Sequence, residues 1–297
     1  MEKILVTGAS GFVGQYVVAE LIRSGYSVIA SSADPEKARR SSWFGQTTYI
    51  PFDLSTFDPG TGYSTLNPAT DFFRWFGEPD RLIHLAWEGL PNYKDSFHTE
   101  VNYPRHAAFL DNLLRHGLRD MTVIGTCLEY GMQEGQLRED LPSRPANSYA
   151  LAKDLLRRRL LELQAGHSFL FRWARLFYMY GKGQNPKSLL SQLDKALEEG
   201  APVFNMSGGD QLRDYLPVEK VAAYLARIAL QDKVTGIINC CSGHPVAVKD
   251  LVEDYLRRNH KEISLNLGYY PYPDYEPMKF WGDNNKLRSI IGDDDIY

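Results

Sequence analysis

The stretch TGASGFVG, residues 7–14, decides the fold because of its neighbours. The strand-like run KILVT, residues 3–7, leads directly into it, and a helical pattern follows over residues 13–24. Strand, glycine-rich loop and helix in this order open a βαβ unit of a parallel sheet. A lone glycine triplet is a weak signal, since turns collect glycine, but this order favours a ligand-binding loop over an ordinary turn.

The three glycines of this stretch have separate tasks. Gly8 permits the tight turn, Gly11 allows the backbone to approach a pyrophosphate, and Gly14 allows the helix to pack closely on the strand. The first N–H groups of the helix and its partial positive charge would then face the phosphates. We therefore predict a dinucleotide cofactor here, in contact with Gly8, Ser10, Gly11, Phe12, Val13 and Gly14.

Strand-like runs and helical patterns alternate through the first half of the chain. We expect strands at residues 3–7, 27–31, 47–52, 81–86 and 121–125, and two more at 168–176 and 236–241. We expect helices at residues 13–24, 102–116 and 149–164, and then at 187–199, 219–230 and 248–259. The alternation predicts the α/β class, with a doubly wound parallel sheet.

The second half of the chain is less regular. Residues 268–277 (GYYPYPDYEP) are dense in Tyr and Pro and predict irregular structure. We predict a dinucleotide-binding domain over residues 1–175, with the chain returning to it near 212–242. Residues 176–211 and 243–297 would form a smaller substrate-binding lobe.

The composition limits the class of protein. The 297 residues are 43% hydrophobic, which supports a real core and argues against disorder. A net charge of -4 gives no electrostatic reason to expect nucleic acid or an anionic membrane as partner. No apolar run reaches a bilayer-spanning length, the N-terminus has no signal-peptide form, and the three cysteines show neither disulfide nor metal spacing. We expect a cytoplasmic protein without a metal.

The end of the second predicted strand distinguishes NAD from NADP. A carboxylate there accepts hydrogen bonds from the ribose 2′-hydroxyl and repels a 2′-phosphate. Here the strand ends at Ser32, with no acid before Asp34, and Lys37, Arg39 and Arg40 follow. The hydroxyl and the cations favour NADP, with Ser32 and Arg39 as contacts. The alternatives are NAD, and cations that form only a solvated helix face.

A phenol and an ammonium stand four residues apart on one predicted helix. Tyr149 and Lys153, in YALAK, therefore share a helical face. An unperturbed Tyr has a pKa of about 10, and a neighbouring Lys together with a cationic nicotinamide could lower it towards neutrality. This pattern occurs by chance in many helices, where an exposed Tyr over a Lys is the ordinary interpretation.

Seven stretches in order resemble the extended short-chain dehydrogenase/reductases, in their nucleotide-sugar epimerase/dehydratase group. They span residues 4–222 and read TGASGFVG, FDL at 52–54, HLAW at 84–87, GTCLEYG at 125–131, YALAK, RLFYMYG at 175–181 and RDYLPVEKVA at 213–222. The resemblance implies a Rossmann-like domain, a nucleotide-diphosphate sugar as substrate, and a homodimer built on the helices at 102–116 and 149–164.

The resemblance also implies a role for each matching residue. Thr126 would hydrogen-bond the substrate oxygen at the reacting carbon, Tyr149 would exchange the proton, and Lys153 would hold the ribose and lower the pKa of Tyr149. Further cofactor contacts would come from Asp53, Leu54, Leu85, Ala86 and Trp87. Substrate contacts would come from Trp87, Cys127, Leu128, Tyr178 and Arg213, with Arg213 gripping the diphosphate or the sugar.

The chain departs from the family pattern after Thr126. In the family's 4,6-dehydratases an acid pair that eliminates water follows directly, but here Cys127 and Leu128 take those positions. Glu129 comes one residue too late, and strand alternation would turn it away from the side of Leu128, which favours a structural role. Cys127, a lone thiol without an obvious base, is more typical of packing than of a nucleophile.

Two further departures affect substrate recognition. The stretch at 175–181 lacks the Asn that many family members carry, and Phe177 and Tyr178 bring bulk instead. Residues 273–277 lack an arginine that relatives often place there. Nucleotide recognition is therefore expected to differ from that of better-known members.

Three functions fit these residues. The favoured one is NADPH-dependent reduction of the C4 ketone of a nucleotide-diphospho-4-keto-6-deoxyhexose, which the CLEYG and RLFYMYG forms also resemble. The alternative is an NAD-dependent C4 epimerase, for which an acid rather than Ser32 would be expected. A non-catalytic NADP-binding sensor comes third, because such members often lose the Tyr or the Lys.

Other candidate residues receive structural interpretations. We expect His84 to be hydrogen-bonded at a strand end, and His98, His106 and His116 to lie on the surface, without metal spacing. The expected packing residues are Trp43, Trp75, Trp173 and Trp281. A leucine stripe at positions 155, 156, 160 and 163 fits either the dimer contact or an ordinary core.

Overall fold

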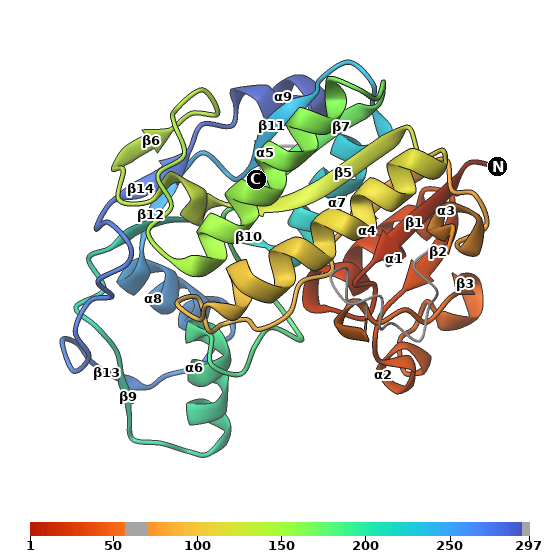
Figure 1. The fold of residues 1–297 in the computed structure, drawn as a ribbon. Helices are drawn as coiled ribbons and strands as arrows, with labels where there is room; N and C mark the ends of the chain where they lie inside the picture. The colour runs from red at the N-terminus through yellow and green to blue at the C-terminus, as the bar shows by residue number, and fades with distance from the viewer. Residues whose placement is uncertain (57–69, 293–297) are drawn as a thin grey trace.

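The computed structural model describes residues 1–56 and 70–292, and Figure 1 shows a parallel sheet with helices on both faces. Residues 57–69 of the predicted first domain and 293–297 of the predicted lobe lie outside the described part. The sheet comprises β1 (Lys3–Thr7), β2 (Ser27–Ser31), β3 (Thr48–Tyr49), β4 (Arg81–His84), β5 (Asp120–Thr126), β7 (Leu170–Leu176) and β11 (Gly236–Cys240). Their order is β11-β7-β5-β4-β1-β2-β3, and every pairing is parallel.

This arrangement confirms the predicted α/β doubly wound fold. The strand order reverses direction between β1 and β4, and ligands of such sheets bind at the carboxyl ends beside that point. All residues of β5 are buried because helices cover both faces. The predicted strand at 47–52 is shortened to β3, since only Thr48 and Tyr49 pair with β2.

The helices form two layers around two hydrophobic clusters. One layer contains α1 (Phe12–Arg23), α7 (Val218–Leu230) and α9 (Asn285–Ile291), and the other α3 (Phe72–Trp75), α4 (Tyr103–His116) and α5 (Ser148–Gln164). The short α2 (Pro35–Arg39) follows β2. No helix within the described ranges has the length and apolar character needed to cross a membrane.

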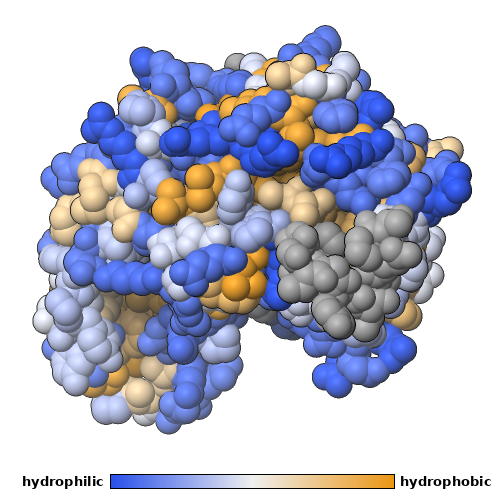
Figure 2. All heavy atoms as spheres, in the orientation of Figure 1, coloured by the Kyte–Doolittle hydropathy of each residue, from blue (hydrophilic) through white to orange (hydrophobic). Residues whose placement is uncertain are grey.

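In the leucine stripe of α5, Leu156, Leu160 and Leu163 belong to the core of the chain itself, while Leu155 is partly buried. Leu156 and Leu160 are fully buried in the cluster beneath α4 and α5. The outer face of α5 carries Leu151 and Leu161, which are 41% and 42% exposed, and Figure 2 shows hydrophobic atoms among charged ones in this region. The homodimer stays a prediction.

The smaller lobe is built on short sheets at the side of the main sheet (Figure 1). Its helices are α6 (Leu189–Glu198) and α8 (Val248–Arg258). Its short strands are β8 (Tyr178–Tyr180), β9 (Val203–Asn205), β10 (Leu212–Pro217), β12 (Pro245–Ala247) and β13 (Ser264–Asn266), and β6 (Gly135–Leu137) pairs with β14 (Phe280–Gly282). β10 lies between β12 and β8, so residues 212–217 join this sheet and the chain returns to the main sheet through α7 and β11. Residues 268–277 are irregular, as predicted.

Candidate active site

The glycine-rich loop after β1 has the shape that its sequence predicts. Gly8 has φ +72°, and a Cβ there would lie 2.7 Å from the backbone N of Ala86. A Cβ on Gly14 would lie 2.1 Å from the carbonyl oxygen of Gly8. Gly11 is the N-cap of α1 and makes no side-chain hydrogen bond to its first turn. This backbone cradle fits the pyrophosphate of a dinucleotide.

The neighbouring strand ends complete the predicted cofactor surface. Ser10 and Leu54 are buried, and the carboxylate of Asp53 accepts a hydrogen bond from the backbone N of Ser55 at 2.8 Å. Leu85 and Ala86 are partly buried directly after β4, opposite Gly8. The contacts of these residues with a cofactor stay predictions.

The end of β2 carries hydroxyl groups instead of a carboxylate. The hydroxyl groups of Ser32 and Tyr49 lie 3.1 Å apart. Asp34 is used for another purpose, because its carboxylate accepts from the backbone N of Lys37 and begins α2. Arg39 donates to Glu36 on the same helix, so this cation is already paired within the structure.

Thr126, Tyr149 and Lys153 meet at the carboxyl end of β5. Asn147 caps α5 by accepting from the backbone N of Ala150 at 2.9 Å, which places Tyr149 in the first turn. The side chain of Thr126 is close enough to the phenol of Tyr149 to lower its pKa. The Nζ of Lys153 donates to the carbonyl oxygen of Ile124 at 2.9 Å, and Ile124 lies on β5 two residues before Thr126. The predicted triad is therefore assembled in space.

Burial changes the proton affinities of this triad. Burial raises the pKa of the Tyr149 phenol well above its usual value, and the nearby Tyr93 and Glu129 raise it further, while the Thr126 side chain acts in the opposite direction. Burial lowers the pKa of Lys153 to about 7, against the attraction of Glu129. The phenol is thus protonated at neutral pH, and the amine titrates near neutrality.

Glu129 has the structural role that was predicted, but for a different physical reason. Residues Cys127–Tyr130 form a 3₁₀ turn rather than a strand, and Thr126 and Glu129 make a capping box at its start. The carboxylate is fully buried and accepts from the backbone N of Thr126 at 2.8 Å, from Trp173 at 3.0 Å and from Arg175 at 2.8 Å. Glu129 therefore holds the end of β5 in place.

Cys127 and Leu128 line an apolar cluster beside the triad, together with Phe177. Burial raises the pKa of the Cys127 thiol, and the carboxylate of Glu276 raises it further. The thiol therefore stays protonated, which fits packing and excludes a ready nucleophile. Contacts of Cys127 and Leu128 with substrate stay predictions.

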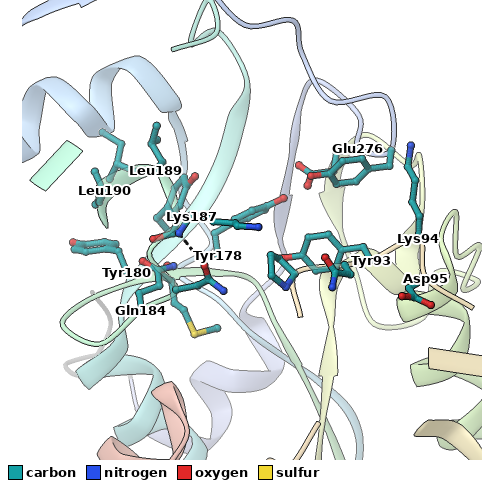
Figure 3. Close-up of a pocket in the computed structure, with 18 residues that line it drawn as sticks. Tyr93, Lys94, Asp95, Tyr178, Tyr180, Gln184, Lys187, Leu189, Leu190 and Glu276 are labelled. Atoms are coloured by element: carbon teal, nitrogen blue, oxygen red, sulfur yellow. Dashed lines mark hydrogen bonds between the residues drawn. The ribbon is translucent and has the colours of Figure 1, made fainter. Parts of the chain in front are cut away.

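A cavity of about 780 Å³ opens next to the triad. Its walls come from residues 91–95 after β4, from β8, from the loop that leads into α6, and from the irregular tail, residues 268–277 (Figure 3). Five tyrosines line it: Tyr93, Tyr178, Tyr180, Tyr215 and Tyr275. The ring of Tyr93 lies 5.6 Å from that of Tyr149, so one wall residue of the cavity is in contact with the triad. Of the five, only Tyr178 was predicted from the sequence.

Arg213 is already engaged by neighbouring groups. Its guanidinium donates to Glu276 at 3.0 and 3.2 Å and to the carbonyl oxygens of Leu212 and Met278 at 2.9 and 3.0 Å. Glu276 lines the cavity, whereas Arg213 is 3% exposed behind it. A grip of Arg213 on the diphosphate stays a prediction, and Glu276 is a cavity carboxylate that sequence reasoning missed.

Two predicted surface histidines are instead buried. His98 and His106 are 0% and 2% exposed, while His84 is hydrogen-bonded at the end of β4, as predicted. The prediction failed because hydrogen-bond partners inside the protein satisfy both rings. Trp43 and Trp173 are packing residues, but Trp75 is 47% exposed. In the described ranges no cluster of three or more His, Cys, Asp or Glu could hold a metal.

Comparisons with known proteins identify the family of the chain. Residues 4–241 match the NAD dependent epimerase/dehydratase family. The dTDP-6-deoxy-L-talose 4-dehydrogenase (NAD(+)) of Aggregatibacter actinomycetemcomitans is 28% identical over 94% of this chain and 98% of its own. The GDP-6-deoxy-D-talose 4-dehydrogenase of the same organism is 25% identical over 98% of this chain and 92% of its own.

Solved structures share the fold over nearly the whole chain. MoeE5 in complex with UDP-glucuronic acid and NAD has a TM-score of 0.77 and 25% identity, covering 98% of this chain and 92% of that protein. The name of that structure states that it contains NAD.

Proposed function

The chain belongs to the NAD dependent epimerase/dehydratase family, and from this premise we propose that it reduces the C4 ketone of a nucleotide-diphospho-4-keto-6-deoxyhexose with NADPH. The observation that carries the proposal is the assembled triad of Thr126, Tyr149 and Lys153 beside a tyrosine-lined cavity. Cys127 and Leu128 occupy the positions at which an acid pair would eliminate water. The chain therefore lacks the groups for dehydration, and the triad supports transfer of a hydride and a proton.

The names of two relatives support the assignment of C4 as the reacting carbon and of a 6-deoxyhexose as the sugar. Both are 4-dehydrogenases of nucleotide-linked 6-deoxytaloses. A 4-dehydrogenase and a 4-ketoreductase run the same reaction in opposite directions, because a hydride leaves or arrives at C4 while a proton leaves or arrives at its oxygen. The same side chains serve both directions.

Each residue of the triad has one task in this reaction. When bound, the nicotinamide supplies the hydride to C4. The Thr126 hydroxyl donates a hydrogen bond to the ketone oxygen, and Tyr149 transfers its phenolic proton to that oxygen. The Lys153 ammonium stabilises the phenolate that remains, and solvent then restores the proton. In the protein without cofactor, burial raises the pKa of Tyr149, opposite to the lowering that the sequence predicted, so the phenol is protonated before reaction.

The proposed cofactor is NADP, with NAD as the alternative. The end of β2 offers the hydroxyls of Ser32 and Tyr49 and no carboxylate that would repel a 2′-phosphate. Arg39 would have to leave Glu36 to reach the phosphate. That pairing, together with the NAD in the names of relatives, is the observation that favours NAD.

An epimerase at C4 is the second candidate. It would use the same three residues but would first remove a hydride and a proton from the sugar and then return the hydride to the other face. The pairing of Arg39 with Glu36 favours NAD over NADP as cofactor, and NAD is the cofactor that the epimerase would use. A nucleotide-binding sensor without turnover is the third candidate.

One assay separates the three candidates. Purified protein would receive NADPH or NADH together with enzymatically generated 4-keto-6-deoxy sugars on several nucleotides, and absorbance and product mass would be followed. We expect oxidation of NADPH and a product heavier by H₂. Interconversion of 4-epimers without added cofactor would move the assignment to the epimerase, and dinucleotide binding without turnover of any sugar would support the sensor.

A further inference from the structure

A series of contacts runs from Thr7 at the end of β1 through the buried His84 and His106 to the partly buried Trp87. The hydroxyl of Thr7 and the Nδ1 of His84 lie 2.7 Å apart, and the Nε2 of His84 lies 2.7 Å from the Nδ1 of His106. The ring of His106 stacks on the indole of Trp87, with centroids 4.5 Å apart and an interplanar angle of 28°. The position of this indole is therefore fixed from the main sheet.

A second histidine holds the edge of the same indole. The Nε1 of Trp87 donates to the Nδ1 of His98 at 3.2 Å, and the two rings lie at 18° to each other. Because Nδ1 accepts this bond, the Nε2 of His98 carries the proton and donates it to the carbonyl oxygen of Asn92 at 3.1 Å. The plane of the indole is thus set by a stacked ring and by a directed hydrogen bond.

The face of this indole is used by the ammonium of Lys153. The Nζ lies 3.9 Å from the centroid of the Trp87 ring, within the distance of a cation–π contact. The other groups that act on the ammonium are the carbonyl oxygen of Ile124 and the carboxylate of Glu129. Burial therefore leaves this cation few compensating contacts, and the indole is one of them.

The charged neighbours of Lys153 are otherwise few. Burial lowers the pKa of His84 to about 3 and the pKa values of His98 and His106 below their usual range, and the ammonium contributes to each of these shifts. The three imidazoles are therefore neutral near pH 7 and do not repel the ammonium. Glu129 is the one carboxylate that attracts it, among the residues described.

We propose that Trp87 is a positioning residue for Lys153: its indole face holds the ammonium in place, and His98 fixes the plane of that indole. Trp87, which follows His84, Leu85 and Ala86, thereby acts on Lys153 directly, and His98 acts on Lys153 only through Trp87. Only the activity readout below rests on the proposed function, since the titration of Lys153 needs no turnover.

The direct test is the titration of Lys153 in protein labelled with ¹³C at the lysine Cε, with Lys153→Met to assign the signal. Trp87→Leu removes the π face, and Trp87→Phe keeps a smaller one. We expect Trp87→Leu to lower the pKa of Lys153 by about one unit, and Trp87→Phe to restore part of that shift. Trp75→Leu, a change of an exposed indole remote from the triad, is the matched control and should leave the titration unchanged.

The same variants should change the pH profile of the reductase. The alkaline limb of kcat/KM should move down by the same amount as the titration in Trp87→Leu, and it should move back in Trp87→Phe. An unchanged or raised pKa of Lys153 in folded Trp87→Leu would overturn the proposal, because it would show that the indole only excludes water. An unchanged titration in a protein without turnover would count against both proposals, whereas a shifted titration without turnover would sink the reductase alone.

His98 offers a second route if Trp87→Leu does not fold. His98→Leu removes the acceptor of the indole N–H, and His98→Gln keeps one. We expect a smaller downward shift of the Lys153 pKa in His98→Leu than in Trp87→Leu, with rescue in His98→Gln. Equal titration curves for the wild type and both His98 variants would overturn the part assigned to His98.

Discussion

Arg213 and Glu276 form a buried ion pair at the wall of the cavity, with the Nη2 of Arg213 3.0 Å from the Oε2 of Glu276. The guanidinium also lies 4.5 Å from the centroid of the Phe280 ring and donates to two backbone carbonyl oxygens. The pair therefore fastens the irregular tail to β10, in addition to any contact with substrate.

Removal of the carboxylate should destabilise the protein. Glu276→Gln leaves the Arg213 guanidinium buried without its counter-charge, so we expect a loss of about 3 kcal/mol in the free energy of unfolding. Urea denaturation checks it. Asp140→Asn, which breaks an exposed pair with Arg138, is the matched control and should cost far less. Equal losses in the two variants would contradict the assigned burial.

The glycine cradle should not tolerate a methyl group. Gly14→Ala would place a Cβ 2.1 Å from the carbonyl oxygen of Gly8, so α1 must shift away from the phosphate site. We expect binding of NADPH, measured by fluorescence titration, to weaken by at least tenfold. Gly45→Ala is the control, because a Cβ there meets no atom within 4 Å. Equal affinity in both variants would place the dinucleotide elsewhere.

A carboxylate at the end of β2 should change the cofactor preference. Ser32→Asp would repel a 2′-phosphate and accept hydrogen bonds from a 2′-hydroxyl, so the ratio of kcat/KM for NADPH over NADH should fall by tenfold or more. Ser32→Ala is the control for loss of the contact with Tyr49. A ratio that does not respond to the new charge would mean that the ribose lies away from this residue.

Loss of the phenolic proton should stop the reaction without unfolding the protein. In Tyr149→Phe we expect kcat to fall by about 10² to 10⁴, because the ketone oxygen loses its proton donor. Tyr26→Phe, at the turn between α1 and β2, is the control and should keep activity. Circular dichroism would confirm that both variants fold. Residual activity of Tyr149→Phe near that of the wild type would assign the proton to another group.

The depressed pKa of Lys153 should appear in the pH dependence of stability. The unfolded lysine titrates near pH 10.5 and the folded one near about 7, so between these values the unfolded state binds more protons. Without cofactor, stability should therefore rise with pH across this window by up to about 1.4 kcal/mol per unit from this residue. Lys153→Met should remove that part of the slope. Parallel slopes for the two proteins would show that Lys153 titrates normally.

The main sheet could be predicted from the sequence because its signals are local. Residues 3–7 carry a buried hydrophobic run, residues 236–240 carry a β-rich run whose last three residues are buried, and the intervening helices show their own periodicity. The three-stranded sheet could not be predicted in this way. Tyr215 pairs with Tyr178 across distant segments, and nothing in either short strand specifies the other.

The same distinction applies to the site. Thr126, Tyr149 and Lys153 could be found because family motifs surround them. Tyr93 and Glu276 stand in segments without such a motif, and only tertiary packing brings them to one cavity. The prediction from strand alternation extends over residues 127–130, although β5 ends at Thr126. It therefore misses the 3₁₀ turn that directs Glu129 inward.

The division of the lobe into separate chain segments has a consequence for engineering. α7 and β11 interrupt it and return to the main sheet, while β12 and β8 hydrogen-bond to the two sides of β10. An exchange of this lobe with that of another family member therefore needs at least two junctions, and both must preserve the register of β10 with its neighbours. In a chimera joined at a single crossover, β10 would pair with a neighbouring strand that comes from the other protein.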